Sequence, residues 1–302
     1  MAVAPATTAC HADDAACLRA VIVAHHQIAE RTWRLRLDCP ALAARAVPGQ
    51  FAMLRIPGRS DPLLGRPLAV YDTFDAEGRP GQGPARYADF VYLVHGRFTT
   101  ALATQRPGDE LAAWGPLGNG FDTPAVDHLL LVAGGIGYTA LLALGRERSG
   151  QARYGFPSRV AAGPQKITFC WGARHAGLFG DVDDFRAAGC DVHLATLDGS
   201  AGIRGTVVDL LDTVVPAGTT VTDRPAGSLH VACCGPEPMM AAVARWSAER
   251  GIGCHVSLEE PMACGIGACF TCVARIKDDA GGWDYRRTCI EGPVFDARSI
   301  EW

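Results

Sequence analysis

The sequence predicts an N-terminal antiparallel six-stranded β-barrel, a doubly wound parallel-sheet domain and a small C-terminal module built around cysteines. Three observations predict this order. Short β-rich segments fill the first third, strands then alternate with helices, and four of the twelve cysteines lie after residue 260. A length of 302 residues fits about two domains of roughly 150 residues. We place the domains at residues 1–124, 125–257 and 258–302.

The barrel is expected from six short segments of strand composition separated by glycine and proline. They are residues 20–24, 32–37, 50–56, 67–71, 89–94 and 109–113. Antiparallel strands of this kind commonly remove their exposed edges by closing into a barrel. Residues 75–86, which contain three glycines and two prolines, are expected to form an inserted loop.

The second domain is expected from strands that alternate with helices. The buried strands are predicted at residues 128–133, 167–171, 190–195 and 229–233, and the helices at 138–145 and 237–250. Gly251 ends the second helix. This alternation predicts a parallel sheet with right-handed crossovers, interrupted by a polar insertion at residues 150–165.

Composition excludes several classes of function. The net charge is −4 and the basic residues form no run, so no nucleic-acid surface is expected. The longest uncharged apolar stretch, residues 129–145, is short for a membrane span and contains four glycines. Residues 1–16 lack the early basic cluster of a secretory signal. We therefore expect a cytoplasmic protein whose cysteines are ligands or core residues rather than disulfides.

The cysteines near the C-terminus follow the C-x4-C-x2-C…C spacing that is typical of plant-type [2Fe-2S] clusters. The predicted ligands are Cys264, Cys269, Cys272 and Cys289. Gly265 and Gly267 strengthen this prediction, because a loop around a cluster turns its N–H groups toward sulfur and often needs positive φ. A structural zinc site is the alternative, but zinc sites usually pair two short knuckles and only one C-x2-C occurs here. A redox-active C-x2-C is a further alternative.

Two loops should meet at the carboxyl edge of the parallel sheet, where open α/β sheets bind ligands. The predicted nucleotide-binding residues are Gly134, Gly135, Gly137, Cys234, Gly235 and Pro236. The glycines would let the backbone approach a pyrophosphate at a helix N-terminus. Their pattern is not G-x-G-x-x-G, and by itself such a turn is as often a packing feature.

Taken together, these segments resemble the ferredoxin reductase superfamily, and within it the electron-transfer subunits of NAD-dependent (class B) dihydroorotate dehydrogenases. The resemblance covers about residues 18–302. Its most specific parts are Glu-Glu-Pro-Met-Ala-Cys-Gly-Ile-Gly-Ala-Cys-Phe-Thr-Cys at residues 259–272 and Cys-Ile-Glu-Gly-Pro-Val-Phe at residues 289–295.

The resemblance implies an oxidoreductase subunit in pyrimidine (UMP) biosynthesis that uses FAD, a [2Fe-2S] cluster and NAD. Dihydroorotate would be oxidised at FMN in a partner catalytic subunit, within a heterotetramer containing two copies of each chain. Electrons would then pass through the cluster and FAD to NAD+. No catalytic acid or base is expected in this chain.

By the same resemblance, two barrel segments bind FAD. The residues are Arg66, Pro67, Leu68, Ala69, Leu93, Val94, His95, Phe98 and Thr99. Phe98 stands where the family usually has glycine, and Ala69 where serine or threonine is common. We expect Phe98 to alter the local flavin-phosphate geometry, because it lacks the positive-φ freedom of glycine.

Two other functions remain open at this point. One is a reductase subunit that passes electrons between NAD(P)H and ferredoxin or another flavoprotein. The other is a nucleotide-sensing module with a zinc-stabilised tail, which would be colourless. Arg174 follows a predicted strand and could meet a 2′-phosphate, so NAD and NADP are not distinguished by the residues alone.

Overall fold

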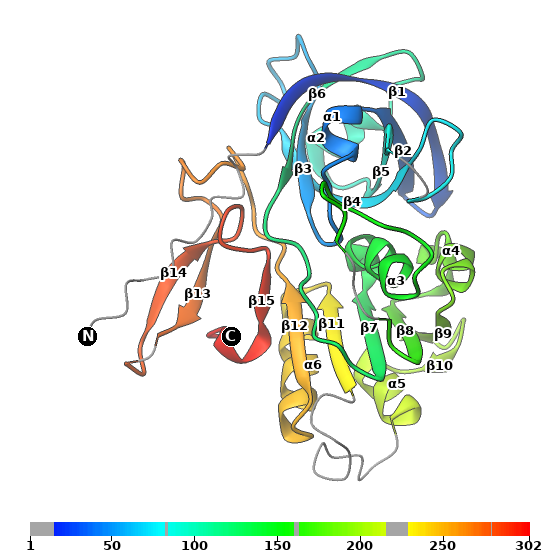
Figure 1. Cartoon of the computed structure of the whole chain (residues 1–302), viewed down its shortest axis with the longest axis vertical. Coiled ribbons are helices and arrows are strands. Elements are labelled where there is room, and N and C mark those ends of the chain that lie inside the picture. Colours follow the sequence, from blue (N-terminus) through cyan, green and yellow to red (C-terminus); the bar gives the residue numbers. More distant parts are fainter. Residues whose placement is uncertain (1–14, 82–83, 160–162, 216–228, 279) are drawn as a thin grey trace.

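The computed structural model describes residues 15–81, 84–159, 163–215, 229–278 and 280–302. A barrel and a mostly parallel sheet lie one above the other, and a two-stranded hairpin projects to one side of them (Figure 1). In this part of the chain, no helix combines the length and the apolar character needed to cross a membrane.

The predicted six-stranded antiparallel barrel is confirmed, and it closes in the order β1-β2-β5-β4-β3-β6. Its strands are β1 (Ala16–Ala29), β2 (Thr32–Asp38), β3 (Phe51–Arg55), β4 (Arg66–Phe74), β5 (Tyr87–Leu93) and β6 (Glu110–Leu117). β1 is much longer than predicted, because irregularities in its pairing with β2 interrupt the alternation of polar and apolar residues. Two helices that were not predicted, α1 (Pro40–Ala43) and α2 (Gly96–Leu102), pack apolar residues into the barrel core.

The predicted doubly wound sheet is also confirmed, with the order β10-β9-β8-β7-β11-β12-β15. Its strands are β7 (His128–Gly134), β8 (Lys166–Ala173), β9 (Asp191–Thr196), β10 (Ile203–Arg204), β11 (Leu229–Cys234), β12 (Gly253–Ser257) and β15 (Val294–Asp296). All neighbouring strands are parallel except β15, which runs antiparallel to β12.

Helices cover both faces of this sheet and create two separate cores. The helices are α3 (Leu142–Arg148), α4 (Val182–Ala187), α5 (Val207–Val214) and α6 (Glu237–Glu249), with short 3₁₀ turns η1 (Gly135–Ala140) and η2 (Ala176–Leu178). The predicted helix at 138–145 is wrong in detail, since η1 and α3 divide it. α5 was not predicted, although Thr206 and Asp209 form a capping box at its start.

The C-terminal part contains the hairpin β13 (Val273–Lys277) and β14 (Trp283–Arg287), then β15 and η4 (Ala297–Ser299). Residues 258–302 are predicted as a small module of their own, and within them β15 joins the parallel sheet as its edge strand beside β12. Apolar contacts also hold it in place: Ile276 and Ile300 join the core beneath α6, and Met262 packs against the barrel residue Met53.

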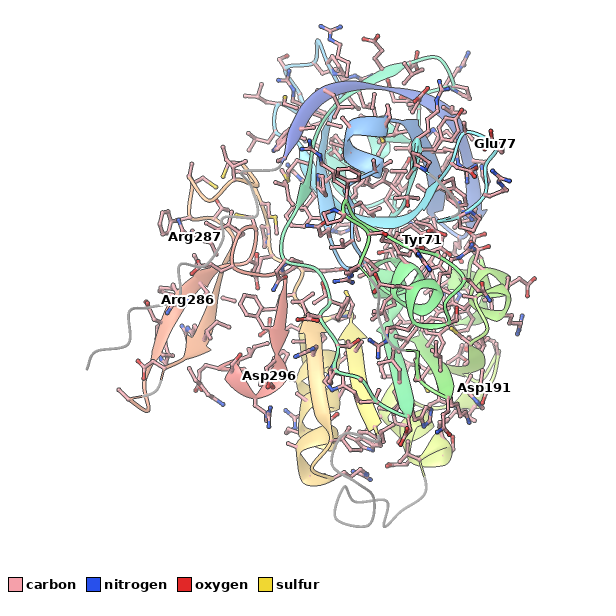
Figure 2. All side chains as sticks on the ribbon, in the orientation of Figure 1. Tyr71, Glu77, Asp191, Arg286, Arg287 and Asp296 are labelled. Atoms are coloured by element: carbon pink, nitrogen blue, oxygen red, sulfur yellow. The ribbon has the colours of Figure 1, made fainter. Side chains whose placement is uncertain are left out.

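Buried ion pairs fix the barrel against the sheet. The guanidinium of Arg34 in β2 lies 3.0 Å from the Asp181 carboxylate and 2.8 Å from that of Asp184, at the start of α4. Tyr71, at the boundary between barrel and sheet in Figure 2, donates its hydroxyl to Asp184 at 3.1 Å. On the same boundary, Asp72 of β4 pairs with Arg146 of α3 at 3.1 Å.

Candidate functional site

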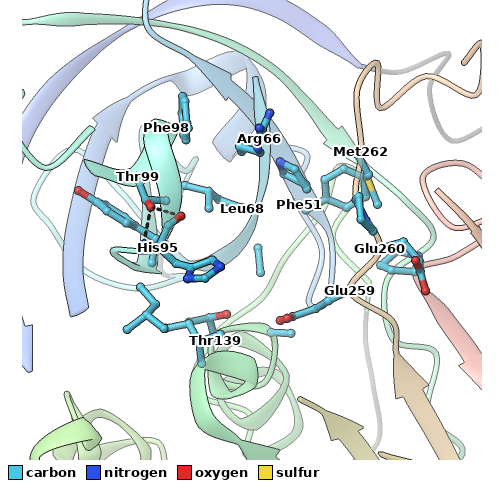
Figure 3. Close-up of a pocket in the computed structure, with 18 of the residues that line it drawn as sticks. Phe51, Arg66, Leu68, His95, Phe98, Thr99, Thr139, Glu259, Glu260 and Met262 are labelled. Atoms are coloured by element: carbon cyan, nitrogen blue, oxygen red, sulfur yellow. Dashed lines mark hydrogen bonds between the residues drawn. The ribbon is translucent and has the colours of Figure 1, made fainter. Parts of the chain in front are cut away.

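Two adjoining cavities lie at the boundary between the domains. The first, about 790 Å³, lies between the barrel, the sheet and the cysteine-rich loop, which is the segment 258–272 between β12 and β13 (Figure 3). Eight of the nine predicted FAD residues line it. They are Arg66, Pro67, Leu68, Ala69, Leu93, His95, Phe98 and Thr99. Val94 does not line this cavity. The structure therefore brings together two barrel segments that are almost 30 residues apart in the sequence.

The second barrel segment is held by Thr99, whose hydroxyl accepts from the backbone N–H of His95 at 2.6 Å (Figure 3). The same hydroxyl donates to the His95 carbonyl at 2.8 Å. Gly96 adopts the positive φ of this segment, 79°, whereas Phe98 lies within α2 with its side chain 3% exposed. The expected disturbance at Phe98 is therefore not seen in the backbone, because the left-handed conformation is two residues earlier.

Arg66 lies at the start of β4, with its side chain on the cavity wall (Figure 3). Its guanidinium donates only to nearby backbone, at 3.0 Å to the Gly65 carbonyl and 3.4 Å to that of Leu64. Among the described residues no carboxylate pairs with it. A cation facing a cavity without a counter-ion can pair with an anionic ligand group such as a phosphate.

The second cavity, about 960 Å³, lies at the carboxyl ends of β7, β8 and β11. Gly134, Gly135 and Pro236 line it, as predicted for a nucleotide site, and Arg174 does as well. Cys234 instead lines the first cavity. The predicted edge of the sheet is thus the place where the second cavity forms.

Two of the predicted nucleotide-binding glycines, Gly137 and Gly235, line neither cavity. A Cβ at Gly137 would lie 2.3 Å from the Cys234 carbonyl oxygen, and one at Gly235 would lie 2.9 Å from the Gly134 nitrogen. These glycines therefore let the β7–η1 and β11–α6 turns approach each other closely, and they shape the wall without touching the cavity.

The two cavities meet at Leu93, Ile136 and Glu259, which line both. The Glu259 side chain faces the cavity and is exposed there, and desolvation by the protein packed around it raises the pKa of its carboxyl. The Cys234 thiol donates to Glu259 at 3.8 Å from Sγ to Oε1, and burial also raises the pKa of this thiol. Glu259 is not among the predicted site residues, although it is the first residue of the motif at residues 259–272.

The cysteine-rich loop turns through three residues with positive φ: Gly265 at 74°, Gly267 at 79° and Phe270 at 55°. The prediction of positive φ at the two glycines is confirmed. The turn directs donors at sulfur: the Ile266 N–H donates to Cys264 Sγ at 3.4 Å, and the Thr271 hydroxyl donates to Cys269 Sγ at 3.1 Å.

The four predicted ligands are arranged as two pairs. Cys264 and Cys269 interact with each other, and so do Cys272 and Cys289. Bonds from the Thr271 hydroxyl and backbone lower the pKa of Cys269 to about 6, and the bond from Cys289 lowers that of Cys272 to about 6 while the pKa of Cys289 is raised. Within the described ranges, no three metal-ligating side chains gather at one point.

This arrangement fits a binuclear cluster better than a single zinc ion. Each iron of a [2Fe-2S] cluster takes two protein ligands, whereas a structural zinc ion takes four around one centre. Two thiol pairs, with hydrogen-bond donors directed at sulfur, supply what two irons need. The loop also reaches the first cavity, because Thr271 and residues 260–263 form part of its wall.

Comparison with known proteins agrees with this geometry. Residues 259–301 match the family model described as the iron-sulfur cluster binding domain of dihydroorotate dehydrogenase B. The dihydroorotate dehydrogenase B (NAD(+)) electron transfer subunit of Bacillus caldolyticus is 32% identical over 288 residues, which cover 93% of this chain and 97% of that protein. Its counterpart in Desulforamulus reducens is 33% identical over 284 residues, with 94% and 97% covered.

Solved structures give the same picture of the fold. The NADH-dependent reduced ferredoxin-NADP oxidoreductase, studied for flavin-based electron bifurcation, aligns with a TM-score of 0.72 and 27% identity, over 94% of this chain and 90% of that one. The ferredoxin reductase of carbazole 1,9a-dioxygenase aligns with a TM-score of 0.62 and 18% identity, over 79% and 67%, and shows the shared fold alone. From its sequence identity over more than nine tenths of its length, the chain belongs to the family of dihydroorotate dehydrogenase B (NAD(+)) electron transfer subunits.

Proposed function

We propose that this chain carries electrons from the catalytic subunit of a dihydroorotate dehydrogenase to NAD+, by way of a [2Fe-2S] cluster and FAD. One observation carries the proposal: the loop that bears three of the four cluster cysteines is also a wall of the cavity lined by the predicted FAD residues. A cluster and a flavin held by the same loop would be neighbours, as direct electron transfer between them requires.

The first cavity is the proposed FAD site. Arg66 would hold the pyrophosphate, because its guanidinium faces the cavity and pairs with no carboxylate of the described residues. The backbone of Leu93 and His95 would orient the flavin. The Thr99 hydroxyl would fix that backbone rather than bind the cofactor, since its hydrogen bonds are to the backbone of His95 and Gly96. Apolar side chains, such as Phe51 and Leu68, would keep water from the ring.

The second cavity is the proposed NAD site, with Gly134, Gly135 and Pro236 along the dinucleotide. The nicotinamide would reach the flavin where the cavities join, beside Leu93, Ile136 and Glu259. Bound FAD supplies the conversion between single electrons and hydride. The chain's own contribution is to align the two rings, with the Glu259 side chain at the junction of the two cavities.

The cluster site is proposed at the two thiol pairs, with Cys264 and Cys269 on one iron and Cys272 and Cys289 on the other. Ile266 and Phe270 of this loop are 51% and 62% exposed, so the loop's outer surface is open to a partner. We propose that an FMN-containing catalytic subunit docks there, in a heterotetramer with two copies of each chain. The domain boundaries proposed for these three sites remain residues 1–124, 125–257 and 258–302.

The proposal is tested by Cys272→Ser, with the exposed Cys17→Ser as matched control. We expect Cys272→Ser to lose the cluster and all electron transfer from the catalytic subunit while NADH still reduces its FAD, because the NAD and FAD cavities do not depend on this thiol. Cys17→Ser should retain both activities. Equal loss of both activities in Cys272→Ser would contradict the separate sites.

The second candidate function is a reductase subunit that exchanges electrons with ferredoxin. The similarity to the NADH-dependent reduced ferredoxin-NADP oxidoreductase supports it. The two are separated by mixing the purified chain with either partner. Dihydroorotate-dependent reduction of NAD+ with an FMN-containing dihydroorotate dehydrogenase subunit is expected, whereas transfer to ferredoxin alone would favour the competitor.

A further inference from the structure

We propose that the Thr271 hydroxyl sets the reduction potential of the cluster through its hydrogen bond to Cys269, and so acts as a positioning residue for electron transfer. The inference rests on the proposed function, because it takes Cys269 as an iron ligand. It goes beyond that function in giving a role to a side chain that is not itself a ligand.

The geometry of the loop supports this role. The Thr271 Oγ1 lies 3.1 Å from Cys269 Sγ, and this bond is exposed at the surface of the loop. Phe270, between them, has a φ of 55°, a left-handed conformation that residues other than glycine, asparagine and aspartate rarely adopt. This conformation folds the chain back over two residues, which brings the hydroxyl to the sulfur.

A side chain from outside the loop supports this conformation. The guanidinium of Arg287 lies 4.8 Å from the centre of the Phe270 ring and donates to the Gly267 carbonyl at 3.2 Å. The Arg287 guanidinium is itself held by Glu291 at 3.2 Å. Arg287, labelled in Figure 2, therefore contacts the turn that precedes Thr271 at two residues, Gly267 and Phe270. A strained turn that is held from outside is a reason to look for a functional role.

The physical effect has a definite sign. A reduced cluster carries more negative charge on its sulfur atoms than an oxidised one, so a donor to sulfur stabilises the reduced form more. The Thr271 hydroxyl therefore raises the reduction potential. Thr271 also lines the first cavity, the proposed FAD site.

The test compares Thr271→Val, which removes the hydroxyl at nearly constant shape, with Thr271→Ser, which keeps it. Thr213→Val is the control, because the Thr213 hydroxyl donates within α5, at 2.7 Å to the Leu210 carbonyl, and Thr213 lines neither cavity. Each full-length chain is purified anaerobically. The cluster potential is measured by a redox titration followed by electron paramagnetic resonance, and flavin content and NADH reduction of FAD are measured separately.

We expect Thr271→Val to shift the cluster equilibrium about tenfold toward the oxidised form, which is about 59 mV for one electron. Thr271→Ser and Thr213→Val should keep this equilibrium within twofold of that of the wild-type chain. An unchanged potential in Thr271→Val would overturn the inference. So would loss of the cluster in Thr271→Val with retention in Thr271→Ser, because the hydroxyl would then be needed for cluster binding. A wild-type chain without a cluster would instead refute the proposed function.

Discussion

Replacement of Arg34 by methionine tests whether buried ion pairs align the barrel with the sheet. Arg34 is 16% exposed and bonds Asp89 in the barrel as well as Asp181 and Asp184 beside the sheet. Removal of one partner of a buried ion pair costs about 3–5 kcal/mol. After the substitution, Asp89 would keep its ion pair with Arg36 at 2.6 Å. The carboxylates of Asp181 and Asp184 are about a quarter exposed, so water would still reach them. We therefore expect the lower end of this range, about 3 kcal/mol.

Two separate assays are needed. Urea denaturation of the FAD-loaded chain measures the free energy of unfolding, and stopped-flow reduction of FAD by NADH measures the rate in the folded chain. Arg34→Met should lower the free energy of unfolding and slow flavin reduction, because the ring-to-ring alignment depends on the relation of barrel to sheet. Arg36→Met is the matched control, since Arg36 pairs with Asp89 inside the barrel and stacks on Phe74. It should lose stability but keep its rate of flavin reduction. A loss below about 1 kcal/mol for Arg34→Met, the size of a surface pair, together with an unchanged rate, would refute the reasoning.

Three further outcomes follow from the structure. Arg66→Ala should lower FAD retention about tenfold or more, because a charge-assisted bond to phosphate is lost; unchanged flavin content after gel filtration would remove Arg66 from the site. Burial raises the pKa of Asp72 from 3.8 to about 6, so the folded state binds the proton more tightly than the unfolded state does. The free energy of unfolding should therefore fall by about 3 kcal/mol as the pH rises from 4 through 6. This dependence should be absent from Asp72→Asn in urea titrations at pH 4.5 and 7, and its persistence there would assign it to another group. Gly137→Ala should destabilise by about 1–3 kcal/mol, because its Cβ would lie 2.3 Å from the Cys234 carbonyl oxygen, and an unchanged melting temperature would contradict that close approach.

The sequence predicts the fold where local signals are strong. The six barrel strands are flanked by turn residues, and buried strands such as β7 are continuous apolar runs. α1, with four residues, and α2, with seven, are too short to show a helical period. Residues 138–140 were predicted as α-helix but belong to η1, which begins in the turn where Gly137 lies close to the Cys234 carbonyl oxygen.

The residues of the candidate site also fall into those that local sequence indicates and those that only the tertiary structure brings together. The cysteine spacing is recognisable from sequence, because three of the four predicted ligands lie close together along one loop, and their role as cluster ligands stays a prediction. Glu259 was missed as a site residue because its position at the junction of the two cavities arises only when barrel, sheet and loop come together. The Arg34–Asp184 pair, which joins residues 150 positions apart, is beyond any local pattern. The bond from Thr271 to Cys269 depends on the left-handed turn at Phe270, for which the residue type gives no warning.

Anaerobic purification with iron and sulfide analysis, followed by electron paramagnetic resonance of the dithionite-reduced chain, tests the central claim most directly. A [2Fe-2S] cluster on the four thiolates predicts about two irons and two sulfides per chain, with a paramagnetic signal that appears on reduction. A chain that contains one zinc ion and gives no signal after reconstitution with iron and sulfide would contradict it.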